Sequence, residues 1–498
     1  MTIGQRPRAI VIAAFLAAVT LAVPGVGAAA PLSVPVTDRN PAVLGAAWQP
    51  QPLGAQDAPQ HPYLAANNGS NIHLNAYQTD ASDFPGPLGR HPNVTSAVLG
   101  GESGTITFDS HGRIVTMVIT PVQSFLEVID PASLNVMSSY AFPASLDRFN
   151  PDGTVNVGGG GYFYLDNEDR AIIPTLDGKI HAISVHPDGS SSLATTVDVR
   201  QHLPADKDVQ STLPDWNGRI WFTTTSGTVG VITDFFGAQP RVATIALGER
   251  VTKSFAADSD GSMSIVSDKA QYRFVADDTG APVVDWRTEY PNDGVIKPGK
   301  LSAGAGSTPT LMDDQWVSTT DNADPVNVVV YRRGPASEGG GKEVCRVPVF
   351  GKGKSASFQS LTWADGQLLV ENNYGYQGIR STLGGVSTVP GLTAIRFDKA
   401  TERCSVAWTN TEAGTPSAIP RLSLANGLVY TVSKPHVPGG PDDWYLTALD
   451  WRTGRIVYSL RYGSSPLMNN NYTAVTLAPD GAAFIGVLGG LVKITDNP

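Results

Sequence analysis

Three polar strings in the chain carry side chains suited to binding a cation: TDNADP, ENNYGY and NNNY. The carboxylate and amide groups that we expect to act as ligands are Asp321, Asn322, Glu371, Asn372 and Asn470. Oxygen atoms of this kind, converging from several segments, are what Ca²⁺ prefers. A calcium ion held there could polarise an ester or lactone carbonyl and activate water. Asn and Asp are also ordinary turn residues, so the strings predict either a calcium site or capped turns.

Charged and aromatic side chains in loops form a second set, which we expect to bind an organic ligand. This set consists of Glu249, Lys297, Tyr374, Tyr376 and Arg421. His73, in GSNIHLNAY, is the histidine with the most polar surroundings. No Gly-x-Ser-x-Gly segment occurs, and the eight histidines lack the spacing of a zinc protease, so neither chemistry is supported.

A repeated element must position these side chains. An Asp- or Asn-x-Gly turn, followed by a strand rich in β-branched and aromatic residues, recurs along the chain. The turn positions are Gly112, Asp169, Gly218, Gly261, Asp314, Gly366, Gly427 and Gly481. They lie 43 to 61 residues apart, a period typical of the four-stranded blades of a β-propeller. The sequence therefore predicts an all-β propeller, with eight blades favoured and seven as the alternative.

The register of the repeat also predicts how the ring closes. The last unit stops at LVKITDNP, after its third strand. Its fourth strand must then come from the N-terminal part of the chain, around Val94 to Leu99. Residues 31–93, rich in Pro, Gln, Asn and Ala, are expected to wrap or close the domain as an extended segment. We thus divide the chain into residues 1–30, 31–93 and the propeller, 94–498.

The first thirty residues predict export. Arg6 and Arg8 precede an apolar run over residues 9–23, and three alanines ending at Ala30 fit a cleavage site. This is the pattern of a secretory signal peptide. No later stretch approaches the ~18 apolar residues of a spanning helix. The mature protein is expected to be secreted, either to the exterior or to the cell envelope.

The net charge limits the classes of binding partner, and the two cysteines predict a disulfide. The net charge is −10 and no Lys/Arg cluster occurs, which argues against nucleic acid or an anionic membrane surface. Cys345 and Cys404 each begin a predicted fourth strand in successive units, and in an exported protein they most economically form a disulfide. The sequence carries no signal for oligomeric state.

One repeat carries a family resemblance. The unit YLTALDWRTGRIVYSL (445–460) resembles the repeat of quinoprotein-alcohol-dehydrogenase-like β-propellers, and FLEVIDPASLNVMSSY (125–140) is a weaker copy. The resemblance implies a pyrroloquinoline quinone held beneath adjacent cysteines, with calcium and an aspartate beside it. Cys345 and Cys404 are 59 positions apart, so this cofactor is not expected. GGGYFYLDNEDR and ENNYGY are similar to exported actinobacterial propellers without assigned activity.

These observations leave three functions open. The favoured one is an exported propeller that binds a small molecule, a glycan or a protein on its loop-rich central face. The first alternative is a calcium-assisted hydrolase of lactones or esters, and the second is a quinone-dependent dehydrogenase-like protein. The loops between second and third strands and those between blades meet at one end of a propeller, where we expect the site to lie.

Overall fold

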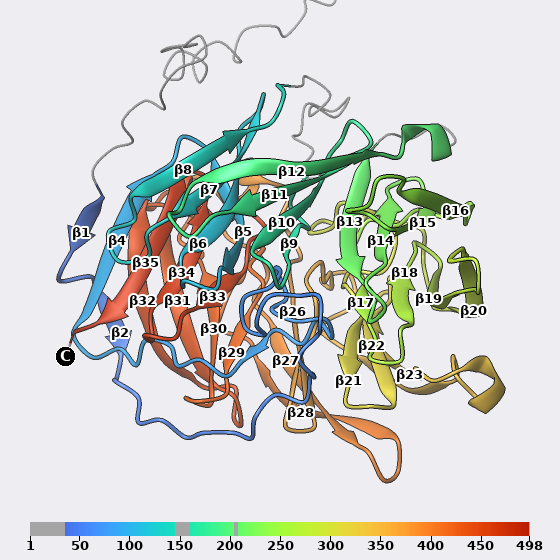
Figure 1. Ribbon diagram of the computed structural model, residues 1–498. Helices are drawn as coiled ribbons and strands as arrows, with labels where there is room; N and C mark the ends of the chain where they lie inside the picture. The colour runs from blue at the N-terminus through green and yellow to red at the C-terminus, as the bar shows by residue number, and fades with distance from the viewer. Residues whose placement is uncertain (1–34, 145–159, 204–207, 498) are drawn as a thin grey trace, which may run out of the picture. The chain divides into compact units, whose positions relative to one another are not determined.

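The computed structural model describes residues 35–144, 160–203 and 208–497, so the predicted signal peptide lies outside the described residues. The described chain forms eight sheets, each with four strands of a propeller blade, arranged around a centre (Figure 1). Four short 3₁₀-helices also occur in this part of the chain: η1 (Arg200–His202), η2 (Ala336–Glu338), η3 (Ile379–Thr382) and η4 (Pro466–Met468). The all-β, eight-bladed expectation is confirmed.

The first four blades follow one another along the chain, each running from an inner to an outer strand. Blade 1 is β5 (Glu102–Phe108), β6 (Ile114–Ile119), β7 (Ser124–Ile129) and β8 (Val136–Ala141). Blade 2 is β9 (Tyr164–Leu165), β10 (Arg170–Pro174), β11 (Lys179–Val185) and β12 (Ser191–Asp198). Blade 3 is β13 (Val209–Pro214), β14 (Ile220–Thr224), β15 (Thr228–Thr233) and β16 (Arg241–Ala246). Blade 4 is β17 (Ala256–Ala257), β18 (Met263–Val266), β19 (Ala270–Ala276) and β20 (Pro282–Glu289).

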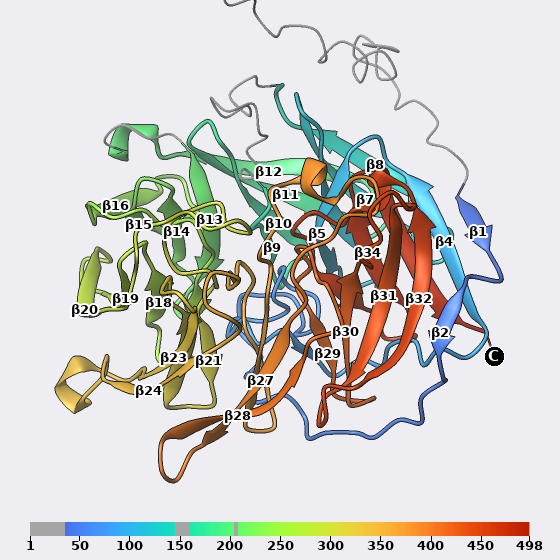
Figure 2. The ribbon, with the colours of Figure 1, turned by 180° about the vertical axis from the view of Figure 1, so that it is seen from behind.

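The other four blades complete the ring seen from behind in Figure 2. Blade 5 is β21 (Thr310–Met312), β22 (Trp316–Thr320), β23 (Asn327–Arg332) and β24 (Glu343–Pro348). Blade 6 is β25 (Thr362–Ala364), β26 (Gln367–Glu371), β27 (Leu392–Asp398) and β28 (Arg403–Asn410). Blade 7 is β29 (Arg421–Ser423), β30 (Leu428–Ser433), β31 (Asp443–Asp450) and β32 (Ile456–Ser464). Blade 8 is β33 (Val475–Leu477), β34 (Ala483–Val487), β35 (Gly490–Asp496) and β4 (Pro92–Val98).

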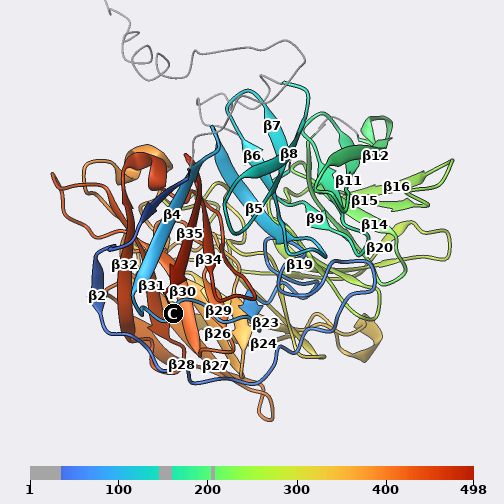
Figure 3. The same ribbon diagram turned by 60° about the vertical axis from the view of Figure 1, so that its left-hand side comes forward.

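The ring closes as the sequence predicts. Strand β4 pairs antiparallel with β35, from Val98 opposite Gly490 to Pro92 opposite Asp496. Figure 3 shows β4 beside β35, so the N-terminal part of the chain supplies the fourth strand of the last blade. Two further N-terminal strands lie outside blades: β1 (Val36–Asp38) pairs with β4, and β2 (Val43–Gly45) pairs with β32.

The Asp-x-x-Gly turns join the first and second strands of the blades. In blade 1, Asp109 Oδ1 accepts hydrogen bonds from the backbone amides of His111 (3.0 Å) and Arg113 (2.8 Å). Its other oxygen accepts from Arg113 Nε at 2.6 Å. Gly112 adopts φ 75°, a left-handed conformation that glycine takes readily. The turn therefore caps itself through Asp109, and Asp166 and Asp215 accept the same pair of backbone bonds in blades 2 and 3.

Hydrophobic residues fill the space between neighbouring blades. Every residue of β6 and of β14 is buried, whereas exposure alternates along the outer strand β8. Trp221 and Phe274 contact each other across blades 3 and 4, and Trp316 and Phe397 across blades 5 and 6. Each blade thus buries both faces only within the ring, since a single four-stranded sheet has no second layer of its own.

Residues 68–82, which we call the plug, lie at the centre of the ring, and every one of them is buried (Figure 1). Short strand β3 (Ala81–Ser82) adds parallel to the inner strand β29. Carbonyl groups of the plug accept hydrogen bonds from inner-strand amides of six blades. These amides belong to Phe108, Leu165, Ala257, Leu311, Trp363 and Leu422. The plug therefore satisfies axis-facing backbone groups that would otherwise be buried without partners.

Candidate ligand site in the central channel

The two ends of the channel differ because of the blade topology. Turns between first and second strands lie at the end that the plug closes, as its bonds to the last residues of β5, β9 and β17 show. In an antiparallel four-stranded blade, loops between second and third strands and between blades lie at the opposite end. We call this opposite end the loop-rich end. The three polar strings of the sequence lie in its loops, at residues 320–325, 371–376 and 469–472.

At the plug end, buried charges are paired in one cluster. Asp80 lies 2.7 Å from Arg421 Nη1 and 3.1 Å from His73 Nδ1. Arg421 also donates from Nε to the Val475 carbonyl and from Nη2 to the Ile72 carbonyl, both at 2.8 Å. Arg421, which the sequence predicts as a ligand-binding residue, is therefore placed in contacts that hold the plug to blades 7 and 8.

Ser360 completes this cluster without making a catalytic triad. Its hydroxyl lies 2.8 Å from His73 Nδ1 and also contacts Asp80. In a triad the serine and the carboxylate contact opposite nitrogens of the imidazole. Here both contact Nδ1, and Nε2 of His73 is buried with no partner in the described residues. The cluster is thus suited to fixing the plug rather than to nucleophilic chemistry.

Two of the predicted calcium ligands, Asp321 and Asn322, are engaged within their own surroundings. Asp321 Oδ1 accepts from the Asn327 amide at 2.7 Å, and Oδ2 from Asn327 Nδ2 at 2.6 Å. Asn322 Oδ1 accepts from Lys300 Nζ at 2.7 Å. The predicted ligand-binding residue Lys297 donates to the Asn322 carbonyl at 2.9 Å. These contacts fix the TDNADP loop against the loop that precedes blade 5.

The other predicted calcium ligands lie in blade 6 and before blade 8. Glu371 Oε1 accepts from Asn373 Nδ2 at 2.8 Å, and burial raises the pKa of the carboxyl well above its usual value. Asn372 Oδ1 accepts from the Ala356 amide at 3.1 Å. Asn470 donates to the Thr473 carbonyl at 3.0 Å, while its Oδ1 has no partner in the described chain.

No group of three or more His, Cys, Asp or Glu residues in the described chain is arranged to hold a metal ion. Asp321 and Glu371 contact different neighbours among the described residues. The calcium site stays a prediction, because the absence of clustered His, Cys, Asp and Glu residues from the described chain does not test a site built from amide and carbonyl oxygens.

Glu249, predicted to bind a ligand, is part of an ion-pair network. Its carboxylate lies 2.7 Å from Arg287 Nη2 and accepts from the hydroxyls of Tyr272 (2.9 Å) and Ser267 (2.5 Å). Burial opposes ionisation, but these hydrogen bonds outweigh it and lower the pKa of Glu249. Tyr374, from the same predicted set, is half-buried, and its amide donates to Asn372 Oδ1 at 3.2 Å.

Three aromatic rings meet at the loop-rich end of the channel. Tyr376, a predicted ligand-binding residue, and Tyr472 have ring centroids 5.2 Å apart in an edge-to-face arrangement. Tyr472 and Phe358 are also 5.2 Å apart and edge-to-face. The rings come from different loops: Tyr376 follows β26, Phe358 precedes blade 6 and Tyr472 precedes blade 8. We call these three residues the aromatic row.

An acid and an amine lie at opposite ends of the aromatic row. Tyr376 donates its hydroxyl to Asn471 Oδ1 at 2.7 Å, and Asn471 Nδ2 donates to Glu102 Oε2 at 2.9 Å. At the other end, Lys253 Nζ lies 2.8 Å from the centroid of the Phe358 ring and donates to the Phe358 carbonyl at 2.8 Å. Neither Glu102 nor Lys253 has an oppositely charged partner within ion-pair distance in the described residues.

Burial shifts the acid–base behaviour of both groups. Burial raises the pKa of Glu102 to about 8, although the hydrogen bond from Asn471 opposes the shift. Burial lowers the pKa of Lys253 well below its usual value, and the nearby charge of Lys300 lowers it further. Ionisable groups shifted in this way, with no structural counter-charge, are characteristic of functional sites.

Sequence reasoning missed Glu102, Lys253 and Phe358. Each is a single residue in an unremarkable stretch, and the three are separated by more than a hundred positions in the chain. Tyr472 lies in the NNNY string, so the polar strings did indicate this region. The position of the site is therefore given by blade geometry and not by any local motif.

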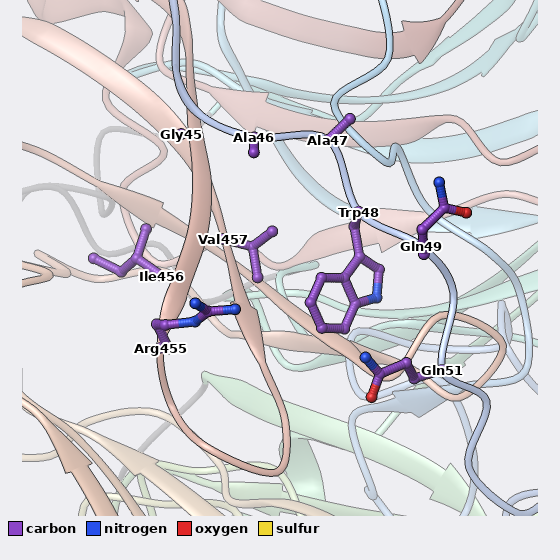
Figure 4. Close-up of a pocket in the computed structure, with 9 residues that line it drawn as sticks. All are labelled: Gly45, Ala46, Ala47, Trp48, Gln49, Gln51, Arg455, Ile456 and Val457. Carbon is purple, nitrogen blue, oxygen red and sulfur yellow. The ribbon is translucent and has the colours of Figure 1, made fainter.

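Two surface pockets lie at the outer edge of the ring. The first, of about 470 Å³, lies between the N-terminal segment and β32 and is lined by Trp48, Gln49, Arg455 and Val457 among others (Figure 4). The second, of about 450 Å³, lies beside β4 and β35 and includes Arg39 and Lys493. Neither brings together groups that could do acid–base or nucleophilic chemistry.

The predicted disulfide is confirmed. Cys345 of β24 and Cys404 of β28 are bonded, with Cα atoms 5.8 Å apart. The bond joins the outer strands of blades 5 and 6, so it lies at the rim of the ring. A disulfide is consistent with an extracellular protein. In the described residues, no helix has the length and apolarity needed to cross a bilayer.

No protein-family model matches the chain. An uncharacterized protein of Archaeoglobus fulgidus is 28% identical over 386 residues, which cover 70% of this chain and 72% of that protein. Among solved structures, BamB from Moraxella catarrhalis matches 86% of this chain and 97% of its own, with 15% identity and a TM-score of 0.47.

Two other solved structures cover most of the chain. The Dos1 propeller matches 88% of this chain and 95% of its own, with 9% identity and a TM-score of 0.46. Sqt1 of Saccharomyces cerevisiae matches 82% and 100%, with 10% identity and a TM-score of 0.44. The eight four-stranded blades of the structure confirm the β-propeller part of the sequence resemblance, and membership of the quinoprotein-like superfamily stays a prediction.

Proposed function

We propose that this protein is an exported β-propeller that binds a small organic molecule at the loop-rich end of its channel. The observation that carries the proposal is the aromatic row between Glu102 and Lys253. An aromatic surface binds apolar ring or chain, and an acid and an amine at its two ends can orient polar groups of the same ligand. These groups come from loops of separate blades, which a rigid ring holds in fixed positions.

The ionisable groups favour a bound small molecule over a purely structural role. Burying a charged group without a partner costs free energy, and a structural site would have replaced it with an apolar residue or paired it. Asp80 and Arg421 illustrate the paired case at the plug end of the same channel. Glu102 and Lys253 are each left with one neutral hydrogen-bond partner, and a ligand would supply the others.

Exposed aliphatic side chains gather in the loops of the same end. Those at least 40% exposed are Val122, Val295, Ile296, Leu301, Ile379, Leu383, Val437 and Leu467. Exposed apolar side chains in the loops at one end of a propeller favour a binding surface there. They favour a ligand with apolar parts, because such a ligand would cover these side chains and remove their apolar surface from water.

Titration calorimetry with three simple aromatic probes tests the proposal. Benzyl alcohol, benzoate and benzylamine share one ring and differ in charge, so at least one should bind with a millimolar or lower Kd. Tyr472→Leu, which removes the central ring, should weaken that binding about tenfold, the equivalent of ~1.4 kcal/mol. Phe236→Ala is the control, because Phe236 is 46% exposed and lies in the turn between the two outer strands of blade 3, β15 and β16. If no probe binds, or if Tyr472→Leu binds as tightly as the wild type, the proposal is wrong.

A further inference from the structure

Four lysines of the described chain are buried: Lys253, Lys297, Lys300 and Lys434. Two of them have a carboxylate partner. Lys297 lies 3.2 Å from Asp293 Oδ2, and Lys434 lies 3.0 Å from Asp442 Oδ1. A buried lysine held by a carboxylate in this way forms a structural ion pair.

Lys434 resembles Lys253 in its burial, its nearby aromatic ring and its end of the ring of blades. Its Nζ lies 5.6 Å from the Trp444 ring, it follows β30 at the loop-rich end, and its side chain is fully buried. Lys253 is 2% exposed and lies against the Phe358 ring, and within the described residues its Nζ donates to the Phe358 carbonyl and to no carboxylate. Lys434 is paired with the Asp442 carboxylate, and Lys253 has no such partner among the described residues.

The neighbour of Lys253 is a second amine instead of an acid. Lys300 is close enough to disfavour a positive charge on Lys253, and burial acts in the same direction. Burial lowers the pKa of Lys300 as well, to about 7, so the two buried amines disfavour each other's positive charge. Apolar surroundings and a neighbouring amine are conditions under which a lysine becomes an uncharged nucleophile. These conditions are met at the end of the aromatic row, where the proposed function places the ligand.

We infer that Lys253 forms an imine with an aldehyde or ketone bound against the aromatic row. The Nζ lone pair adds to the carbonyl carbon, the two amine protons leave with the carbonyl oxygen as one molecule of water, and a C=N bond remains. No oxidant or reductant takes part, and water reverses the step. The inference rests on the proposed function, and it narrows the ligand class to carbonyl compounds with an apolar body.

The aromatic row favours a carbonyl carried on a flat or apolar group. The Phe358 ring lies directly against Nζ, and Tyr472 lies edge-on to Phe358, so a ligand ring that stacks there brings its substituent close to the amine. Benzaldehyde is the simplest such probe. It shares its ring with the three probes of the binding experiment, which allows the two tests to be compared.

Reductive trapping tests the inference on the wild-type protein. The protein is incubated with benzaldehyde and sodium cyanoborohydride at pH 7, digested, and labelling of each lysine is measured by mass spectrometry. An ordinary lysine is only about 0.04% uncharged at this pH. Lys253 should therefore be labelled at least about tenfold faster than the matched Lys434 and the exposed Lys352. From pH 7 to pH 9 the labelling of Lys352 should rise about a hundredfold, and that of Lys253 by far less.

Two variants and one comparison complete the experiment. Lys253→Met should abolish the fast labelling, whereas Lys434→Met should leave it unchanged, and melting curves verify that each variant folds. The inference is overturned if wild-type Lys253 is labelled no faster than Lys434. If benzyl alcohol still binds in that case, the proposed function stands and only imine formation is rejected. If no aromatic probe binds and no selective labelling occurs, both are rejected.

Discussion

At the plug end of the channel, Asp80 lies 2.7 Å from Arg421 and 3.1 Å from His73. At the loop-rich end, Glu102 accepts a hydrogen bond from the side-chain amide of Asn471, and Lys253 donates one to the Phe358 carbonyl. Asp80, Arg421 and Lys253 are buried, whereas Glu102 is half-buried. The paired end holds a segment of the chain in place, and the unpaired end is where a molecule from outside could supply the missing partners. Burial alone therefore does not distinguish the two ends, and the presence or absence of a counter-charge does.

The largest expected change in stability comes from removing the cation of the Asp80–Arg421 ion pair at the plug end. Arg421→Met should destabilise the protein by ~3–5 kcal/mol, because it leaves the buried Asp80 carboxylate without its cation. Urea unfolding measures the change. The double variant Asp80→Asn/Arg421→Met should recover part of the loss, since no uncompensated charge then remains. If the single variant is as stable as the wild type, the cluster does not hold the plug.

A rim variant provides a reference that alters neither end of the channel. Replacing Cys345 and Cys404 with serine opens a loop across blades 5 and 6 and should cost ~2–4 kcal/mol, mainly through the entropy of the unfolded chain. Urea unfolding again gives the change. Probe binding at the loop-rich end should persist in this variant under native conditions. A variant that loses binding while folded would show that the rim and the site are coupled.

Glu102 should make the loop-rich end sensitive to pH. Its pKa is raised to about 8 in the folded protein, against a usual value near 4.5, so the folded state binds its proton more tightly. Stability from this group is fully present below pH 4.5 and is lost as pH rises through 8. The wild type should therefore lose melting temperature over this range more steeply than Glu102→Gln. Identical pH profiles of the two proteins would contradict the assignment.

The smallest effect is expected where Asp57, in the N-terminal segment, meets Asp313. Burial, a hydrogen bond to Asp313 and the charge of Asp313 raise the pKa of Asp57 to about 6. Because Asp57 is largely exposed, the loss of stability as pH rises from about 4 to 6 should be slight. Asp57→Asn should remove it, as followed by melting temperature. If Asp57→Asn changes the pH dependence of the melting temperature more than Glu102→Gln does, the proposed ranking of these two groups is wrong.

The scaffold could be predicted from the sequence because its signals are local and repeated. An aspartate that caps its own turn, as Asp109 does, has to recur wherever that turn recurs, and the incomplete last unit implied the closing strand. The plug gave no such signal. Its sequence, NGSNIHLNAYQTDAS, is polar because many of its side chains hydrogen-bond within the segment itself, as Asn71, Asn75 and Gln78 do. A polar aperiodic stretch is typical of a surface loop.

The candidate site was harder still to predict. Lys253 and Phe358 are brought together by the ring, and neither has a neighbour in sequence that suggests chemistry. The polar strings did point to the loop-rich end, but Asp321 and Asn322 proved to be engaged with nearby loops. Unpaired groups are defined by what lies around them in space, and one sequence does not contain that information.

The plug also constrains the order in which the molecule can be assembled. Residues 68–82 leave the ribosome before every one of the inner strands to which they bond, from Phe108 to Leu422. The segment continues at both ends into strands on the outside of the ring, so it cannot be threaded into a finished barrel of blades. The blades must therefore assemble around the plug, and the last blade is complete only when β35 pairs with β4. Folding of this chain should therefore be slow, and a protein truncated before residue 490 should fail to close.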